Sequence, residues 1–336
     1  MKAAIRTGFL GYTFSFVENH TKPAFNPCSQ QDKSNVYVKV KSAGINPVDY
    51  KLPRMIGGRT IGSDFCGTIE KIGSGIDESL FKVGDDVFGT CSSGSLAECC
   101  VANSDNIAKK PTDWTYEECA ALPVAYMSAL QSLRIGKITC DVEGGNKEKS
   151  VLVIGASGGC GIAGIQLCKA MGVGRIVAIC SKKNSDLVKD LGATEVVPYD
   201  DENEMSSFFT NNNEQFDCVY DAATNSGGGE DYWTMSKNLL KRDDSEECIG
   251  QYVALNGPAS KWVRALSGKQ KANEAIMMMK SNTQDLQLIT TLLNKTGARP
   301  VINKMTFSNE GMENGFELLK SRRTKGKIVF NFMQNN

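Results

Sequence analysis

The first third of the chain carries short β-branched and apolar runs that alternate with turn residues. Runs at residues 36–40, 67–72 and 86–89 are bounded by Gly, Pro, Asp or Asn, and residues 94–101 give a further alternating run. Short strands separated by turn signals indicate hairpins. An open sheet leaves its edge strands exposed, whereas a sheet that folds on itself leaves fewer exposed edges. We therefore expect a barrel or sandwich rather than an open sheet.

Apolar residues take helical spacing from Tyr116 onward. One stripe of a single predicted helix holds Cys119, Leu122, Ala125, Tyr126, Ala129 and Leu130. A polar linker at residues 141–149 follows this segment. We therefore expect a domain boundary within the predicted helix.

Beyond the linker, apolar runs alternate with helical segments. The run at residues 151–154 is continuously apolar, which is typical of a parallel strand buried on both faces. Further strands are predicted at residues 175–180, 195–198, 216–220, 251–255 and 275–279, with helices between them at residues such as 162–171 and 185–191. Strands joined by helical crossovers predict a doubly wound parallel sheet with strand order 3-2-1-4-5-6.

The tail returns to the β-rich character of the first part. It carries predicted helices at residues 286–293 and 311–320 and predicted strands at residues 301–305 and 327–332. We expect the tail to rejoin the first domain. The predicted organisation is one domain made of residues 1–124 and 284–336, with a second domain, residues 125–283, inserted into it.

Composition and charge narrow the function classes. The 336 residues are 41% hydrophobic and 23% charged, which is ordinary globular composition for about two domains. Lys plus Arg and Asp plus Glu each number 38, so no overall field favours nucleic acid or a membrane surface. The chain starts without a secretory hydrophobic stretch and carries no apolar run long enough to cross a bilayer. We expect a cytoplasmic protein with neither nucleic acid nor a membrane as partner.

The cysteine and histidine pattern argues against a metal site. The 12 cysteines stand singly, apart from the vicinal pair Cys99–Cys100, and His20 is the only histidine. Zinc sites need clustered Cys and His ligands. We therefore expect no metal, and reduced thiols rather than disulfides.

The strand at residues 151–154 runs directly into a glycine-rich turn. The turn reads Gly155-Ala156-Ser157-Gly158-Gly159-Cys160-Gly161, and a predicted helix follows it. Glycines let the backbone approach phosphates, while the helix N-terminus offers N–H groups and positive dipole charge. The turn therefore predicts a dinucleotide site, with contacts from Gly155, Ser157, Gly158, Gly159, Cys160 and Gly161. The alternative is an ordinary tight turn between a strand and a helix.

The end of the second strand of this domain bears on the choice of cofactor. An acidic residue about 20 positions past the glycines would bind the ribose 2′-hydroxyl of NAD. Here the stretch reads Cys180-Ser181-Lys182-Lys183-Asn184, which holds hydroxyl, ammonium and amide donors and no carboxylate. This favours NADP(H), with Ser181, Lys182 and Asn184 as binding residues. A solvated helix start is the alternative reading of the two lysines.

Blocks of sequence then follow one another in a recognisable order. They are residues 43–51 (Ala-Gly-Ile-Asn-Pro-Val-Asp-Tyr-Lys), 62–67 (Gly-Ser-Asp-Phe-Cys-Gly), 120–125, 299–301 and 325–329. Together they resemble the zinc-independent quinone oxidoreductase branch of the medium-chain dehydrogenase/reductase superfamily, from Met1 to Phe332. The resemblance implies an α/β fold in which a Rossmann doubly wound parallel sheet is inserted into a GroES-like β-barrel substrate domain.

The resemblance also implies roles for single residues. In zinc-dependent relatives a cysteine would stand at Asn46, a histidine at Ser63 and a second cysteine near Val124, so the resemblance implies no catalytic zinc. The implied cofactor contacts are Ser181, Asn184 and Tyr199 near the adenosine phosphate, Ser128 and Asn46 near the nicotinamide, and Asn256 and Gly257 beside its ribose. The chain departs from the branch in the loop after Thr224 and around residues 141–149.

Without zinc, hydride transfer suits a carbon that conjugation has already made electrophilic. We therefore expect NADPH-dependent reduction of quinones or α,β-unsaturated carbonyl compounds. The candidate catalytic residues are Asn46 as an amide donor, Tyr50 as a proton source and Lys51 as a charge beside an enolate. Tyr50 as a packed ring and Lys51 as a solvated side chain are the alternatives. Asp49 and Asp64 are expected to hold loops, because nothing in the local sequence indicates a raised pKa.

Two other functions stay open. A 2-enoyl thioester reductase would share the fold and the hydride chemistry but would need a channel for a long acyl carrier. A nucleotide-binding protein with a structural or interaction role and little turnover belongs to another class. The expected partner is a small molecule, and the choice between a monomer and a homodimer stays open.

Overall fold

The computed structural model describes residues 1–336 apart from residues 8–12, 52–57, 141–144, 225–230, 271 and 334–336. The chain forms two compact units. The first consists of Met1–Met127, Lys280–Thr290 and Pro300–Asn336, and the second of Ser128–Met279 and Thr291–Arg299. The first boundary lies inside a helix, α4 (Pro123–Ile135), and another divides α10 (Thr283–Thr296).

One long strand, β3 (Asn35–Ile45), organises the first unit. It pairs antiparallel with β4 (Asp64–Ile72) on one side. On the other side, its first half pairs with β6 (Cys99–Asn103) and its second half with β15 (Lys327–Asn331). Register shifts against β4 mark two irregularities in this strand pair, of the kind that bend a strand and let it serve two neighbours.

The described residues of this unit form a seven-stranded sheet and a two-stranded sheet. The larger sheet runs β14-β15-β3-β4-β5-β7, with β6 beside β3. Its remaining strands are β5 (Asp86–Thr90), β7 (Ile107–Lys109) and β14 (Ile302–Thr306), and the smaller sheet is the hairpin of β1 (Ala3–Thr7) and β2 (Thr13–Val17). The strand predicted at residues 94–101 begins only at Cys99, because Gly94 has a positive φ and Ser95 and Leu96 bond back to the chain at Gly62 and Ile61.

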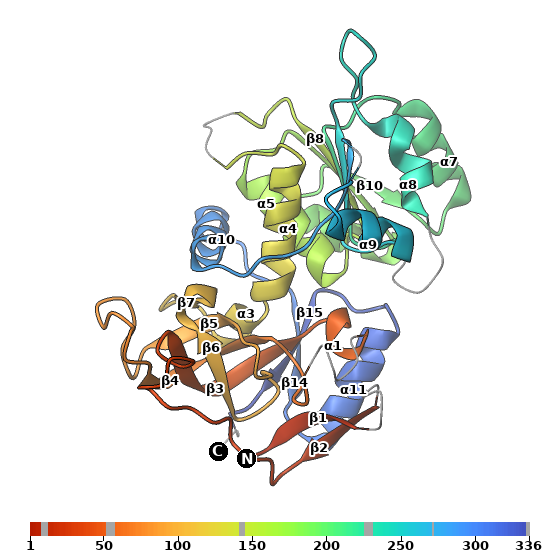
Figure 1. Ribbon diagram of the computed structural model, residues 1–336. Helices are drawn as coiled ribbons and strands as arrows, with labels where there is room; N and C mark the ends of the chain where they lie inside the picture. Colours follow the sequence, from red (N-terminus) through yellow and green to blue (C-terminus); the bar gives the residue numbers. More distant parts are fainter. Residues whose placement is uncertain (8–12, 52–57, 141–144, 225–230, 271, 334–336) are drawn as a thin grey trace. The chain divides into compact units, whose positions relative to one another are not determined.

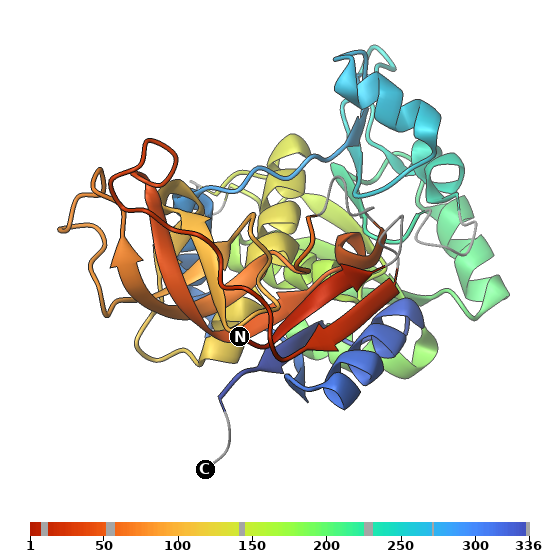
Figure 2. The same ribbon diagram turned by 60° about the horizontal axis from the view of Figure 1, so that its bottom comes forward.

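Helices cover this sheet and close its apolar core. They are the short α1 (Pro47–Lys51) and α3 (Tyr116–Ala120), the start of α4, and α11 (Asn309–Lys320). Helix α11 lies beside β2 and β14 (Figures 1 and 2). Phe316 of α11 packs against Phe14 of β2, with ring centroids 4.8 Å apart. The tail thus contributes to the core of the first unit.

The single helix predicted from Tyr116 is two helices. Thr115 and Glu118 form a capping box at the start of α3, which ends at Ala120. The second helix, α4, begins at Pro123, because proline lacks the N–H that a continuous helix would need and suits a first turn. The whole predicted stripe is nevertheless buried: Cys119, Leu122, Ala125, Tyr126, Ala129 and Leu130.

The second unit is a doubly wound sheet. Its described strands run in the order β10-β9-β8-β11-β12-β13, and all neighbouring pairs are parallel. In sequence order this is 3-2-1-4-5-6, so the predicted topology is confirmed. The strands are β8 (Ser150–Ile154), β9 (Arg175–Cys180), β10 (Glu195–Pro198), β11 (Cys218–Asp221), β12 (Gln251–Ala254) and β13 (Glu274–Ile276).

The helices of this unit are α5 (Gly159–Ala170), α6 (Ser185–Leu191), α7 (Glu202–Asn211), α8 (Tyr232–Ser236) and α9 (Ala259–Leu266). Residues 151–154 of β8 are fully buried, as expected for a central parallel strand. Two predicted strands differ in extent. Phe216 makes only an isolated bridge with Leu240, so β11 starts at Cys218. The strand predicted at residues 275–279 is observed as β13, at residues 274–276. It lies at the edge of the sheet and, among the described strands, pairs only with β12, which ends at Ala254.

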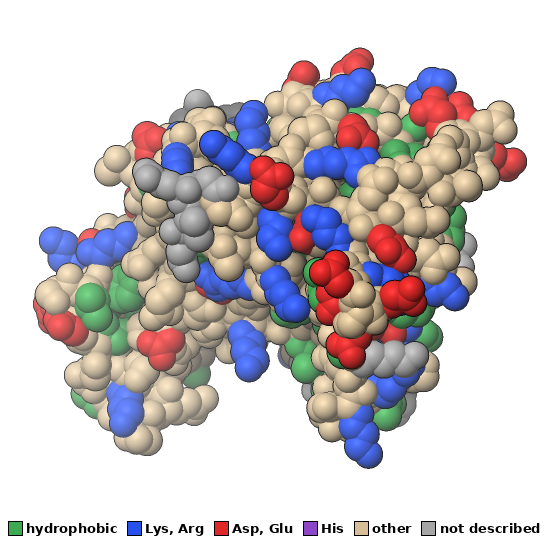
Figure 3. All heavy atoms as spheres, turned by 90° about the horizontal axis from the view of Figure 1, so that it is seen from above, with side chains coloured by type: hydrophobic (Ala, Val, Ile, Leu, Met, Phe, Trp, Pro, Cys, Tyr) green, Lys and Arg blue, Asp and Glu red, His purple; other side chains and the backbone are tan. Residues whose placement is uncertain are grey.

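Charges of both signs are interspersed on the surface that Figure 3 shows. Residues 241–247 are mostly exposed, whereas residues 225–230, in the loop after Thr224, lie outside the described residues. Every cysteine is a free thiol. None of the described helices is long and apolar enough to cross a membrane.

Candidate active site

The glycine-rich turn of the second unit connects β8 to α5. Gly155 has a φ of 73°, which side chains other than glycine rarely adopt. A Cβ at Gly161 would lie 2.2 Å from the carbonyl oxygen of Gly155, so the turn and the helix are closely packed there. Helix α5 starts after Gly158, which supplies no side-chain cap. The first turn of α5 therefore suits a phosphate group, whose oxygens accept hydrogen bonds from backbone N–H groups.

A side-chain bridge links this turn to the loop that follows β9. The Asn184 amide Nδ2 donates to Ser157 Oγ at 3.0 Å. Asn184 is only 6% exposed, and its buried Oδ1 has no hydrogen-bond partner among the described residues. An unpaired buried carbonyl oxygen is costly, and a ribose hydroxyl would supply the missing donor. The residues that the sequence predicted here thus fit a dinucleotide.

Two carboxylates from the neighbouring strand reach the same loop. The backbone N–H of Lys182 donates to Asp200 Oδ1 at 2.7 Å, and the Lys182 ammonium lies 3.8 Å from Asp201 Oδ2. Tyr199, which is exposed, donates its backbone N–H to the Cys180 carbonyl. Neither acid was predicted as a neighbour of the cofactor, because the prediction for this loop rested on residues 180–184. Their signal was their position directly after strand β10, since parallel neighbours end at the same edge of a sheet.

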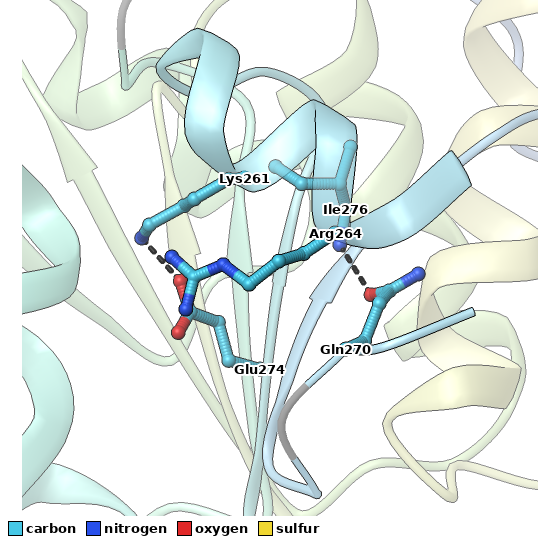
Figure 4. Close-up of a pocket in the computed structure, with 5 residues that line it drawn as sticks. All are labelled: Lys261, Arg264, Gln270, Glu274 and Ile276. Atoms are coloured by element: carbon cyan, nitrogen blue, oxygen red, sulfur yellow. Dashed lines mark hydrogen bonds and ion pairs between the residues drawn. The ribbon is translucent and has the colours of Figure 1, made fainter. Parts of the chain in front are cut away.

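Asn256 and Gly257 follow β12 and pack against α9. The Trp262 indole donates to Asn256 Oδ1 at 3.3 Å, and a Cβ at Gly257 would lie 2.9 Å from Ile276. The pocket of Figure 4 is lined by Lys261, Arg264, Gln270, Glu274 and Ile276. Within it, Lys261 forms an ion pair with Glu274, and Gln270 accepts the backbone N–H of Ile276 at 2.9 Å. The roles of Asn256 and Gly257 beside the ribose stay predictions.

Asp221 is a further functional candidate that sequence reasoning missed. It ends β11, is buried, and its Oδ1 accepts the backbone N–H groups of Ala223 and Thr224 at 2.8 and 2.9 Å. The Tyr252 hydroxyl donates to its Oδ2. Ala223 contacts the position where Gly155 would carry a Cβ. Asp221 therefore fixes the chain that borders the glycine-rich turn, and its strand-end position was the available signal. Ser128, in α4, is buried, and its predicted role stays a prediction.

A buried ion pair lies at the centre of the predicted catalytic residues of the first unit. Lys327 Nζ lies 3.1 Å from Asp64 Oδ2, and their side chains are 6% and 0% exposed. The ammonium also donates to the Ile45 carbonyl at 3.0 Å and to Asn46 Oδ1 at 2.5 Å. The Lys327 ammonium therefore has three oxygen acceptors, which compensate for its removal from water.

The three positions at which the resemblance places zinc ligands in other enzymes all donate to the Asp64 carboxylate. Asn46 Nδ2 donates to Oδ2 at 2.9 Å, while Ser63 Oγ and the Val124 backbone N–H donate to Oδ1 at 3.4 and 3.2 Å. This fixes the Asn46 amide, because the opposite orientation would place its NH₂ against the ammonium. Its second N–H makes no hydrogen bond within the described chain.

Asp49 belongs to the same buried cluster. Its carboxylate accepts the Asn46 backbone N–H at 2.7 Å, and its carbonyl accepts a hydrogen bond from Arg6 at 2.7 Å. Burial raises the pKa of Asp49 to about 7; the Asn46 N–H opposes this shift and the Asp64 charge adds to it. The expectation that Asp49 keeps an ordinary pKa is wrong, because its burial is not visible in the local sequence. Its predicted hydrogen bonding within the loop is confirmed.

Tyr50 and Lys51 follow on α1. The Tyr50 ring packs against the core, 6.0 Å from the ammonium groups of both Lys51 and Lys320, and its hydroxyl makes no hydrogen bond within the described chain. Burial raises the pKa of Tyr50. Burial, with a smaller effect of the Arg322 charge, lowers the pKa of Lys51. Their catalytic roles stay predictions.

No group of three or more His, Cys, Asp or Glu side chains is arranged to hold a metal among the described residues.

Two family patterns match the chain. Residues 32–116 match the alcohol dehydrogenase GroES-like domain, and residues 191–330 match a family described as zinc-binding dehydrogenase. The 2-methylene-furan-3-one reductase of Solanum lycopersicum is 29% identical over 317 residues, covering 88% of this chain and 71% of the relative. The chloroplastic quinone-oxidoreductase homolog of Spinacia oleracea is 29% identical over 311 residues, covering 87% and 88%.

Solved structures show the same fold. The quinone oxidoreductase of Coxiella burnetii superposes with a TM-score of 0.77 at 24% identity, covering 99% of each chain. The Escherichia coli quinone oxidoreductase, solved in complex with NADPH, superposes with a TM-score of 0.72 at 18% identity over 99% of this chain and 100% of its own.

These matches define an oxidoreductase fold of a GroES-like and a Rossmann domain. Residues 32–116 and 191–330 match dehydrogenase families, and the similar proteins agree with the resemblance to the quinone oxidoreductase branch of the medium-chain dehydrogenase/reductase superfamily. The predicted fold class is confirmed.

Lys327→Met should destabilise the first unit by about 3–5 kcal/mol, because it leaves the Asp64 charge buried without its partner. The double variant Lys327→Met/Asp64→Asn should be less destabilised than Lys327→Met, since it removes the stranded charge. Urea unfolding measures both. Lys109→Met is the control, because it breaks an ion pair whose lysine is 51% exposed and should cost at most about 1 kcal/mol. Equal losses for Lys327→Met and Lys109→Met would contradict the importance of the buried pair.

Asp49→Asn should change how stability depends on pH. The pKa of Asp49 is higher in the folded state, about 7, than the reference value of 3.8, so the folded protein binds the proton more tightly between these values. The contribution of Asp49 to stability is present below about pH 4 and is lost as the pH rises towards 7. The Asp49→Asn variant lacks this loss, so its stability relative to wild type should increase across that range, by at most about 1.4 kcal/mol per pH unit. Urea unfolding at pH 4, 5.5 and 7 tests this, and parallel profiles for the two proteins would refute it.

Proposed function

We propose that this chain transfers hydride from NADPH to quinones or α,β-unsaturated carbonyl compounds without zinc. The observation that carries the proposal is that the start of α5, which has no side-chain cap, lies beside Asn184, whose buried Oδ1 has no partner in the described part of the chain. The NADPH complex of the Escherichia coli quinone oxidoreductase, which has the same fold, supports this choice of cofactor. Lys182 and Lys183 favour the 2′-phosphate over a plain hydroxyl.

The substrate class follows from what the first unit can and cannot supply. Asn46, Ser63 and Val124 offer an amide, a hydroxyl and a backbone N–H to Asp64, and none of these is an ordinary zinc ligand. Lys327 already neutralises the carboxylate. A bound NADPH would supply a hydride, and without a Lewis acid the acceptor carbon must be activated by conjugation. The names of the tomato and spinach relatives, a furanone reductase and a quinone oxidoreductase homolog, agree with this class.

Asn46 and two residues of α1, Tyr50 and Lys51, would act on the acceptor oxygen. Asn46 has one N–H not used by Asp64, and its orientation is fixed before substrate arrives, which is what stabilisation of developing charge needs. The Tyr50 hydroxyl is protonated at neutral pH and is available as a proton donor, although burial raises its pKa and so makes it a weaker acid than an exposed tyrosine. Lys51 would add positive charge near the enolate. A 2-enoyl thioester is the alternative acceptor for the same chemistry.

The purified protein should oxidise NADPH when a quinone or a short enone is added, and should do so faster with NADPH than with NADH. Activity should survive treatment with a chelator, because no zinc takes part. The rate at which NADPH absorbance decreases measures turnover, with quinones, enones and enoyl thioesters tested in parallel. Turnover on thioesters alone would favour the enoyl reductase, and tight NADPH binding without turnover would favour an interaction role. Loss of activity on chelation, restored by zinc, would sink the metal-free mechanism.

Tyr50→Phe should lower kcat/KM for an enone by about 10²-fold while NADPH affinity stays unchanged, because it removes only a proton donor. The fold should be little affected, since the hydroxyl has no hydrogen bond within the described chain. Tyr116→Phe is the matched control, because its hydroxyl bonds to Asp86 at 2.7 Å and has no proposed catalytic role. Quinones should respond less, because their reduced product is aromatic and needs little protonation by the protein.

Asn46→Ala should also lower kcat/KM, but it opens the contacts of Lys327 and Asp64, so its kinetics must be read beside its unfolding curve. Wild-type kcat/KM for both Tyr50→Phe and Asn46→Ala on every accepted substrate would make the two residues structural.

A further inference from the structure

Two acids lie close to Lys182, which is predicted to bind the phosphate of the adenosine. Pro198 of β10 lies opposite Cys180 of β9 in the parallel register, so the segments after these two residues leave the same edge of the sheet. Lys182 is in one segment, and Asp200 and Asp201 are in the other. A 2′-phosphate bound by Lys182 would therefore lie close to negative charge that the sequence of residues 180–184 does not reveal.

The two acids play different parts. Asp200 Oδ1 accepts the backbone N–H of Lys182 at 2.7 Å, so it holds the loop in place. Asp201 Oδ2 lies 3.8 Å from the Lys182 ammonium, which is the group that would bind the phosphate. The Lys182 side chain is 70% exposed and that of Asp201 30% exposed. A solvated pair at this distance is weak, so a doubly charged phosphate can displace it.

We propose that Asp201 is a specificity-determining residue that works against the 2′-phosphate. It holds Lys182 in the absence of the phosphate and repels the phosphate once it is bound. NADH carries a neutral 2′-hydroxyl and does not meet this repulsion. The chain therefore accepts NADH as a second cofactor, and Asp201 sets how strongly NADPH is preferred. The inference rests on the proposed use of NADPH.

The chain offers a variant that removes the charge and keeps the structure. Asp201 also caps α7, because its Oδ1 accepts the backbone N–H of Glu204 at 3.1 Å. Asparagine caps helices as well as aspartate does, so Asp201→Asn leaves the cap in place. Asp200→Asn is less informative, because Asp200 holds the Lys182 backbone.

The test measures dissociation constants of the full chain by calorimetry for NADPH, NADH and adenosine 2′,5′-bisphosphate. Asp201→Asn should tighten NADPH and the bisphosphate about 3- to 10-fold at low salt, the effect of one charge at short range in partly screened surroundings. NADH affinity should stay within about twofold, and the gain should shrink at high salt. Asp244→Asn is the control, because it removes one negative charge from the exposed loop at residues 241–247. It should change none of the three constants.

A second experiment, in the Lys182→Met variant, tests whether Asp201 acts through the Lys182 ammonium. In Lys182→Met, Asp201→Asn should have a smaller effect on NADPH, because there is no ammonium left to hold. An unchanged ratio of NADPH to NADH affinity in Asp201→Asn would overturn the inference and leave Asp201 as a helix cap only. If the wild type binds neither dinucleotide, the proposed function fails together with the inference, whereas NADPH binding without a shift in Asp201→Asn refutes the inference alone.

Discussion

The buried pair between Lys327 and Asp64 is the contact on which the first unit depends. It joins the first residue of the last strand to the first residue of β4, far apart in sequence, and it takes Ile45 and Asn46 at the end of β3 into the same network. Two charges removed from water are stable only when each finds enough partners, and here both do. The chain must therefore bring its tail back beside its first strands, and the Rossmann unit is left as an insertion between them.

The same network holds Asn46, the proposed amide donor to the substrate. Neutralising Asp64 with an ammonium leaves an amide, a hydroxyl and a backbone N–H aimed at the carboxylate, and the charges on either side allow the Asn46 amide one orientation. Asp49 lies in the same buried cluster, and burial disfavours its charged form, which raises its pKa to about 7. A rigid polar group held by paired charges would suit the proposed hydride acceptor, on whose oxygen negative charge would develop. Asn46 is therefore better understood as part of a charged framework than as a separate donor.

Features that depend on neighbouring residues could be predicted from the sequence. The order of the parallel sheet followed from apolar runs and crossovers, and the glycine-rich turn is a contiguous stretch whose steric reason is local. The full length of β3 could not be predicted, because its last residues, 42–45, pair with the distant strand β15. The partners of the site residues were missed for the same reason. Lys327, Asp200 and Asp221 act across the edge of a sheet from segments that the sequence separates.

The ion pairs Lys327–Asp64 and Lys182–Asp201 differ in the way that their roles require. Lys327 and Asp64 are withdrawn from water and have further partners, so separating them would leave a bare charge in the interior. Lys182 and Asp201 lie 3.8 Å apart, with side chains 70% and 30% exposed, so water can take the place of a partner that leaves. A pair that must hold three strand ends together has to be buried, and one that must give way to a ligand has to stay exposed. Burial, rather than charge alone, therefore distinguishes the pair that stabilises the fold from the pair proposed to govern cofactor choice.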